Sequence, residues 1–321
     1  MDTYPSSQAK LFEQTPIQRP YDTELEVAQV ALLARYAPDA RIRRVRWSQG
    51  ETQALELGAG PPLLLVHGGF ASGFFWAPML PALARQHRAL VVDLPGHGLA
   101  DPFDYRGVDP LGHARMFLGD MLDALDLRAV DIVANSLGGL WSAAFALTAP
   151  ERVRRLALVG AAPGVNRWIP LQLRILGLPV VGQTLGRRLM VNPSREANRR
   201  FWGEILVAHP ERLDDTLLDA DIAHARRNID SMLSLVSSVS ALGGLRRRLV
   251  LGARWEQLRP PTLFLCGARD AFMRPDVWAI WVEFAARNAH LQVTRLPEAG
   301  HLPWLDEPER VVDEIERFLS V

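Results

Sequence analysis

Residues 130–139 read VDIVANSLGG, and this stretch decides the fold. Its first half is short and almost wholly apolar, which is typical of a strand buried on both faces of a parallel sheet. A helical run begins at Leu137, so Ser136 lies on a sharp strand-to-helix turn that projects its hydroxyl above the carboxyl edge of the sheet. Ala134 and Gly138 are small enough to leave space for that turn. An N-cap role for Ser136 is the simpler alternative, and this stretch alone does not exclude it.

Similar apolar runs recur on both sides of this stretch. They lie at residues 63–66, 90–92, 156–159 and 262–266, and an alternating run at 291–296 suits an edge strand. Amphipathic stretches at 78–86, 110–125, 137–148, 275–287 and 308–319 lie between or after them. This alternation predicts an α/β fold with a mostly parallel, doubly wound sheet, built from residues 41–162 and 259–321.

One interval and one terminal segment do not follow this alternation. Residues 163–258 lack a clear buried strand but show helical periodicity at 171–189, 195–208, 213–226 and 229–242. A loop of that length without secondary structure is implausible in a compact domain, so we expect a helical cap inserted after the sixth strand. Residues 1–40 form a separate N-terminal leader with a helix expected at 23–36, which could pack on the core or on a partner.

Three short motifs supply what a serine nucleophile needs. A weakly acidic hydroxyl requires a base, a group that orients the base, and donors for the developing oxyanion. Asp270 follows a strand in CGARD, and His301 follows the last strand in EAGHLPW. Upstream, HGGF at residues 67–70 ends another strand, where backbone N–H groups can face the nucleophile. We interpret His67 as a structural residue that holds this loop.

Taken together, LLLVHGGF, VVDLPGHGLAD, IVANSLGG, LFLCGARD and EAGHLPWLDEP resemble the α/β-hydrolase fold family, in the family's order. The resemblance covers about residues 41–162 and 259–321. It departs from the family pattern at Ala134, where glycine is usual. The resemblance implies Ser136 as nucleophile, His301 as general base and then acid, and Asp270 as the residue that orients the imidazole.

The same resemblance implies an oxyanion hole and a substrate pocket. The oxyanion would be bound by the backbone N–H groups of Leu137 and Gly69, with Phe70 as second choice, and the helix dipole would add to this. The cap would set the substrate. The candidate substrate-binding residues are Phe70, Asn135, Trp168 and Phe201, which suggest a small to medium apolar ester or lactone as substrate.

Several other functions remain open. The Asn135-Ser136 pair is common among meta-cleavage-product hydrolases, which split C–C bonds in dienone acids. Members of that branch usually carry Trp after the catalytic His and Asn near the oxyanion loop, whereas this chain has Leu302 and no Asn in residues 71–80. C–C hydrolysis therefore ranks below ester or lactone hydrolysis. An acyltransferase, a perhydrolase or a non-catalytic ligand receptor could use the same residues.

The amino-acid composition excludes several other classes of function. The 36 basic and 36 acidic residues of this 321-residue chain balance, so no global field attracts nucleic acid or an anionic membrane. Lys10 is the only lysine, which removes Schiff-base and P-loop chemistry. Cys266 is the only cysteine and the histidines lack metal-ligand spacing, so we expect no disulfide, metal or cofactor. We expect no membrane span or signal peptide, a cytoplasmic location, and a monomer or homodimer.

Overall fold

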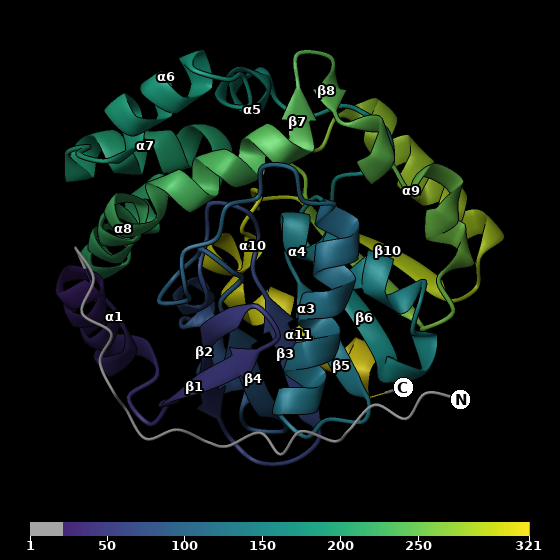
Figure 1. The fold of residues 1–321 in the computed structure, drawn as a ribbon. Coiled ribbons are helices and arrows are strands. Elements are labelled where there is room, and N and C mark those ends of the chain that lie inside the picture. Colours follow the sequence, from purple (N-terminus) through teal and green to yellow (C-terminus); the bar gives the residue numbers. More distant parts are fainter. Residues whose placement is uncertain (1–21, 321) are drawn as a thin grey trace.

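An eight-stranded sheet forms the centre of the molecule in the computed structural model, which describes residues 22–320 (Figure 1). The strand order is β1-β2-β4-β3-β5-β6-β9-β10; β1–β2 and β2–β4 pair antiparallel, and every other pair is parallel. The strands are β1 (Arg41–Trp47), β2 (Gly50–Leu57), β3 (Pro62–Val66), β4 (Arg88–Val92), β5 (Val130–Ala134), β6 (Val153–Val159), β9 (Thr262–Gly267) and β10 (Leu291–Leu296). The predicted fold class is confirmed.

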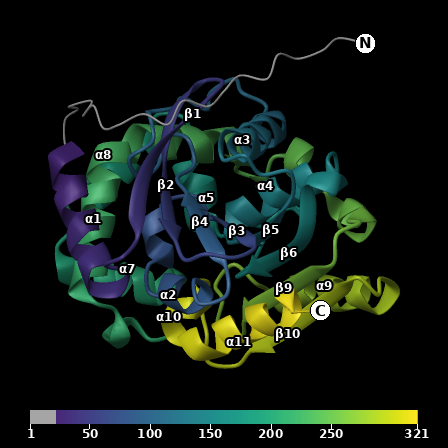
Figure 2. The ribbon, with the colours of Figure 1, turned by 90° about the horizontal axis from the view of Figure 1, so that it is seen from below.

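Hydrophobic side chains cover both faces of the sheet, as the continuous apolar runs predict. In β3, Leu64 and Val66 belong to one core cluster, whereas Leu63 and Leu65 belong to the other. Helices α3 and α4 pack on the first face, and α2 and α11 pack on the second (Figure 2). The helices of the core are α2 (Leu80–Leu83), α3 (Pro110–Ala124), α4 (Ser136–Ala146), α9 (Pro275–Arg287), α10 (Pro303–Asp306) and α11 (Pro308–Leu319).

The chain between β6 and β9 forms an arch of helices over the carboxyl ends of the strands (Figure 1). This arch contains α5 (Leu171–Leu176), α6 (Val181–Met190), α7 (Arg195–Ile205), α8 (Asp215–Val239) and a small hairpin of β7 (Ser240–Ala241) and β8 (Gly244–Leu245). Short 3-10 turns at Pro210–Arg212, Arg247–Leu249 and Gly252–Gln257 complete it. We call α5 to α8 the cap helices.

Three predicted helix boundaries are wrong. The helix expected at 171–189 is two helices, because Pro179 interrupts it and Val180 adopts a φ of 62°. The helices expected at 213–226 and 229–242 are one helix, α8; Asn228 at the expected break is buried and donates to the Gly98 carbonyl at 2.9 Å. The helix expected at 78–86 shortens to α2 because its last turn tightens to i→i+3 bonds, such as Gln86 N to Leu83 O.

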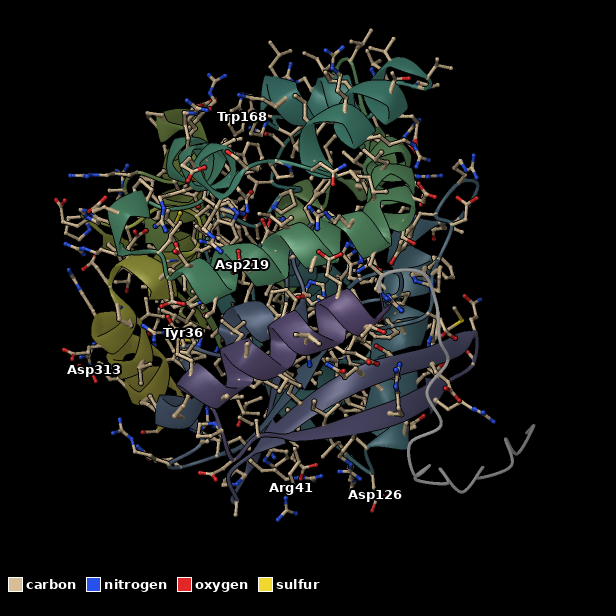
Figure 3. The ribbon with its side chains drawn as sticks, turned by 90° about the vertical axis from the view of Figure 1, so that its left-hand side faces the viewer. Tyr36, Arg41, Asp126, Trp168, Asp219 and Asp313 are labelled. Carbon is tan, nitrogen blue, oxygen red and sulfur yellow. The ribbon has the colours of Figure 1, made fainter. Side chains whose placement is uncertain are left out.

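Helix α1 (Asp22–Tyr36) lies where the leader helix is expected, at 23–36, and residues 1–21 of the leader lie outside the described residues. It packs along α8 beneath the cap (Figure 3). Leu25 and Leu32 of α1 are fully buried, and Arg35 pairs with Asp214 at 2.6 Å. The leader helix therefore braces the cap helix α8 against the core. Among residues 22–320, no helix combines the length and the apolar character needed to cross a bilayer.

Buried His113 on α3 links stability to pH. Its ring packs among Trp47, Phe103, Tyr105 and Trp141, and neither ring nitrogen has a hydrogen-bond partner among residues 22–320. Burial lowers the pKa of His113 from 6.5 to about 4. At pH 5 the unfolded chain therefore binds a proton here that the folded chain does not, so stability falls as the pH drops from above 6.5 toward 4.

Replacement of His113 by phenylalanine removes this proton-linked loss. Because of this difference in pKa, His113 should lower the free energy of unfolding by about 2 kcal/mol between pH 7.5 and pH 5. We expect the free energy of unfolding of the wild type to fall by about 2 kcal/mol more than that of His113→Phe over this interval. Urea denaturation at both pH values measures the difference. Equal falls in the two proteins would contradict a neutral buried imidazole.

Candidate active site

Ser136 lies on a strained turn between β5 and α4. Its φ is 51°, a conformation that non-glycine residues rarely adopt. The turn depends on close backbone approach, because a Cβ at Gly138 would lie 2.3 Å from the His67 carbonyl oxygen. A Cβ at Gly68 would similarly lie 2.9 Å from the Ser136 Cβ. The two glycines therefore let the Ser136 turn, at the carboxyl end of β5, lie directly against the loop that follows β3.

Asp270 and His301 form a buried pair at the same edge of the sheet. Asp270 follows β9 and His301 follows β10, and both are almost fully buried. Nδ1 of His301 lies 3.0 Å from each carboxylate oxygen of Asp270. Asp270 also accepts the Ala161 N–H at 2.9 Å and the Phe272 N–H at 2.8 Å. These bonds hold the carboxylate so that it fixes the Nδ1–H tautomer of His301 and leaves Nε2 free to accept a proton.

Two further contacts hold His301 in place. The ring of Phe272 stacks on the imidazole with ring centroids 4.1 Å apart. Asn135 Nδ2 donates to the carbonyl of His301 at 3.2 Å and to that of Val159 at 2.7 Å. Asn135, a predicted substrate-binding residue, therefore uses its amide N–H groups to join the Ser136 turn to the His301 loop.

A cavity of about 540 Å³ lies between the cap helices and the sheet edge, and we call it the cap cavity. Ser136 and His301 both line it, whereas Asp270 lies behind His301. The structure contains no hydrogen bond between Ser136 Oγ and His301. Such contacts are often long before substrate binds and tighten in the reacting complex. The three side chains predicted from distant motifs therefore meet at one edge of the sheet.

The loop after β3 presents free backbone donors to the same cavity. His67 Nδ1–H donates to the Gly68 carbonyl at 2.7 Å, and Nε2 accepts the Leu94 N–H at 2.9 Å. Burial lowers the pKa of His67 well below its ordinary value, so the ring stays neutral and acts as a brace. Gly69 and Leu137 line the cap cavity, and within the described residues neither of their N–H groups donates a hydrogen bond. Phe70 also lines it, with a φ of 61°.

Apolar side chains form most of the cavity wall. Trp168 and Phe201 line it, as does Phe70, and the Arg274 guanidinium lies 5.6 Å from the Trp168 ring centroid. Phe201 is 43% exposed, which places it at the rim. All four residues predicted to bind substrate therefore reach the same cavity, although Asn135 has a structural use for its amide.

The charged residues of the cavity are acidic. Glu204 and Asp221 line it, and among the described residues no arginine does. Burial raises the pKa of Asp221 to about 6. Asp221 is not among the site residues predicted from the sequence. The signal available was a carboxylate within the apolar face of a helix, next to Leu217, Leu218 and Ala225.

Comparisons with known proteins agree on the fold. The family described as alpha/beta hydrolase fold matches residues 61–308. A 2-hydroxy-6-oxononadienedioate/2-hydroxy-6-oxononatrienedioate hydrolase of Cupriavidus pinatubonensis is 31% identical over 228 residues, 69% of this chain and 75% of that protein. A pimeloyl-(acyl-carrier protein) methyl ester esterase of Xanthomonas campestris is 28% identical over 275 residues, 82% and 97% of the two chains. A carboxylesterase structure from Bacillus subtilis, 20% identical, superposes with a TM-score of 0.75 over 94% of this chain and 99% of that one.

Proposed function

Since the chain belongs to the α/β-hydrolase fold family, we propose that it is a cofactor-independent serine hydrolase that cleaves small to medium apolar esters or lactones through an acyl-enzyme. One observation carries the proposal. A serine on a strained turn and a histidine oriented by a buried carboxylate line one apolar cavity.

The proposed reaction begins with attack of Ser136 Oγ on the carbonyl carbon of the substrate. His301 Nε2 accepts the hydroxyl proton as the new C–O bond forms, and Asp270 stabilises the imidazolium. The N–H groups of Gly69 and Leu137 bind the negative oxygen of the tetrahedral intermediate, with support from the positive end of α4.

Collapse of this intermediate breaks the bond to the leaving alcohol, which takes the proton from His301. An acyl-enzyme on Ser136 remains. Water then attacks the acyl carbon while His301 accepts its proton, and the second tetrahedral intermediate releases the carboxylic acid and restores the Ser136 hydroxyl. Protons balance over the cycle, since His301 accepts and returns one in each half.

C–C hydrolysis is the second candidate, favoured by the 31%-identical relative named as an oxononadienedioate hydrolase. Its substrates would carry carboxylate groups into the cap cavity. The charged residues Glu204 and Asp221 repel such groups, and no arginine among the described residues lines the cavity to bind them. Arg174, for example, donates to the Ile169 carbonyl at 2.9 Å. The charge of the cavity therefore supports neutral esters or lactones over dienone acids.

A panel of purified substrates tests the proposed function. We expect hydrolysis of p-nitrophenyl acetate to hexanoate and of simple lactones, with much lower kcat/KM for dienone acids. Faster cleavage of dienone acids would instead favour C–C hydrolysis. Strong acceleration by an added alcohol or amine acceptor would indicate an acyltransferase, and tight ligand binding with negligible turnover would indicate a receptor.

Substitutions in the cap wall should change the choice of acyl chain. We expect a long acyl chain to reach Trp168 and Phe201 in the cavity wall and an acetyl group not to, and each buried methylene is worth about 0.8 kcal/mol. We expect Trp168→Ala or Phe201→Ala to change the octanoate-to-acetate ratio of kcat/KM by about 3- to 10-fold. Val282→Ala, at an exposed position on α9, serves as the control. Equal effects on both substrates would count against a pocket role.

A further inference from the structure

We propose that Asp221 makes the cap cavity selective for substrates that carry a protonated amine on the part held beneath the cap helices. This inference rests on the proposed ester or lactone hydrolysis and adds the charge of the substrate to it.

Only one oxygen of the Asp221 carboxylate is used by the protein. Oδ2 accepts Trp202 Nε1–H at 2.8 Å and Asn198 Nδ2–H at 3.0 Å, both from α7. Among the described residues, no donor bonds Oδ1 and no basic side chain pairs with Asp221. Asp219, two residues earlier on α8 and labelled in Figure 3, instead pairs with Arg195 at 2.8 Å. Asp221 thus keeps an acceptor oxygen and an unbalanced negative charge at the cavity wall.

The surroundings of Asp221 favour a cationic partner. Leu217, Leu218 and Ala225 on the same helix are buried, and burial raises the pKa of the Asp221 carboxyl to about 6. The ionised form therefore predominates at pH 7 but is poorly solvated. A carboxylate in that state gains more from an ammonium group than one in water would, because the low dielectric strengthens the pairing.

The rest of the cavity reinforces this preference. Glu204 adds a second carboxylate to the lining, and His301 is its one basic residue among those described. Beneath the cap helices an anionic group would meet the carboxylate of Asp221, with the exposed Glu204 also in the lining, and no arginine or lysine among the described residues. A neutral alkyl chain would leave Oδ1 of Asp221 without a hydrogen bond. An ammonium group satisfies both the charge and the free oxygen.

A purely structural role is the competing explanation, because the bonds from Trp202 and Asn198 tie α7 to α8. Such a role predicts that replacing Asp221 changes stability and lowers activity equally for every substrate. Selectivity for charge is the readout that separates the two explanations. Asp221→Asn is the suitable variant, because its amide oxygen can still accept from Trp202 while the negative charge is lost.

The test uses methyl esters of ω-amino acids of six to eight carbons, each paired with the alkanoate methyl ester one carbon longer. We expect the ammonium-to-neutral ratio of kcat/KM to fall at least about tenfold in Asp221→Asn for one or more chain lengths. Asp219→Asn, which removes a carboxylate from the same helix outside the cavity, should leave the ratio within about twofold. An unchanged ratio at every length, or an equal fall for both members of each pair, overturns the inference.

A binding measurement on the unmodified protein removes the dependence on turnover and on the folding of the variant. Calorimetric titration should show hexylammonium binding at least about tenfold more tightly than hexanol and hexanoate. Equal or weaker binding of hexylammonium overturns the inference. If the neutral esters are hydrolysed but neither experiment shows charge selectivity, the role of Asp221 is refuted while the proposed ester hydrolysis stands. If no ester is cleaved, the proposed function fails, and the titration still decides the role of Asp221.

Discussion

Replacement of Ser136 by alanine is expected to lower kcat for any cleaved ester by more than about 10³-fold. The hydroxyl is the proposed nucleophile, and no other group on the turn can form the acyl-enzyme. Stability should change little, since the side chain makes no hydrogen bond within the described structure and alanine retains the Cβ. Steady-state kinetics together with thermal unfolding measures both quantities.

A matched control for this variant lies on the same helix. Ser142 of α4 is fully buried, and its Oγ has no hydrogen-bond partner in the part of the chain that the structure describes. Ser142→Ala removes an identical hydroxyl six residues away and should keep kcat within about threefold. Turnover in Ser136→Ala equal to that of the wild type would refute the assignment of the nucleophile.

The second large effect is expected at the base and its orienting carboxylate. His301→Ala should lower kcat by more than about 10³-fold, and Asp270→Asn by somewhat less. In Asp270 the Ala161 N–H bonds Oδ2 and the Phe272 N–H bonds Oδ1. An asparagine must turn its NH₂ group toward one of these two donors, so Asp270→Asn should also lose stability.

Asp306 provides the control for Asp270. It is equally buried near His301, but it accepts the N–H groups of Gly300, Ala208 and His209 at 2.8–3.0 Å. Asp306→Asn should therefore lower the unfolding temperature while kcat stays within about tenfold. A larger loss of kcat in Asp306→Asn than in Asp270→Asn would show that the orienting carboxylate has been assigned to the wrong residue.

The central strands were predictable because their burial is almost uniform. A strand covered on both faces must be apolar at every position, and Leu63 to Val66 meet that condition. Strand β1 was harder to identify, since RIRRVRW lies at the sheet edge and four of its seven residues are arginines, none of them buried. His87, just before β4, is only 8% exposed and its Nε2 lies 3.1 Å from the carboxylate of Glu316, a contact between residues 229 positions apart that no local pattern indicates.

The candidate site was also predictable only in part. Ser136, Asp270 and His301 each follow a strand, and the carboxyl ends of parallel strands meet at one edge, so their approach follows from the strand order. The cap cavity depends on how helices pack against one another. The predicted boundaries of the cap helices were wrong because Pro179 interrupts one expected helix, whereas α8 continues through Asn228, where a break was expected. The place of Asp221 in the cavity wall depends on the packing of α7 on α8, where Asn198 and Trp202 donate hydrogen bonds to its carboxylate.

Covalent labelling with a fluorophosphonate, followed by mass spectrometry of the digested protein, tests the central claim most directly. We expect one adduct per chain, located on the peptide that contains Ser136, with labelling abolished in Ser136→Ala and greatly slowed in His301→Ala. An adduct on a different residue, or an unlabelled protein that still hydrolyses esters, would contradict the assignment of Ser136 as an activated nucleophile.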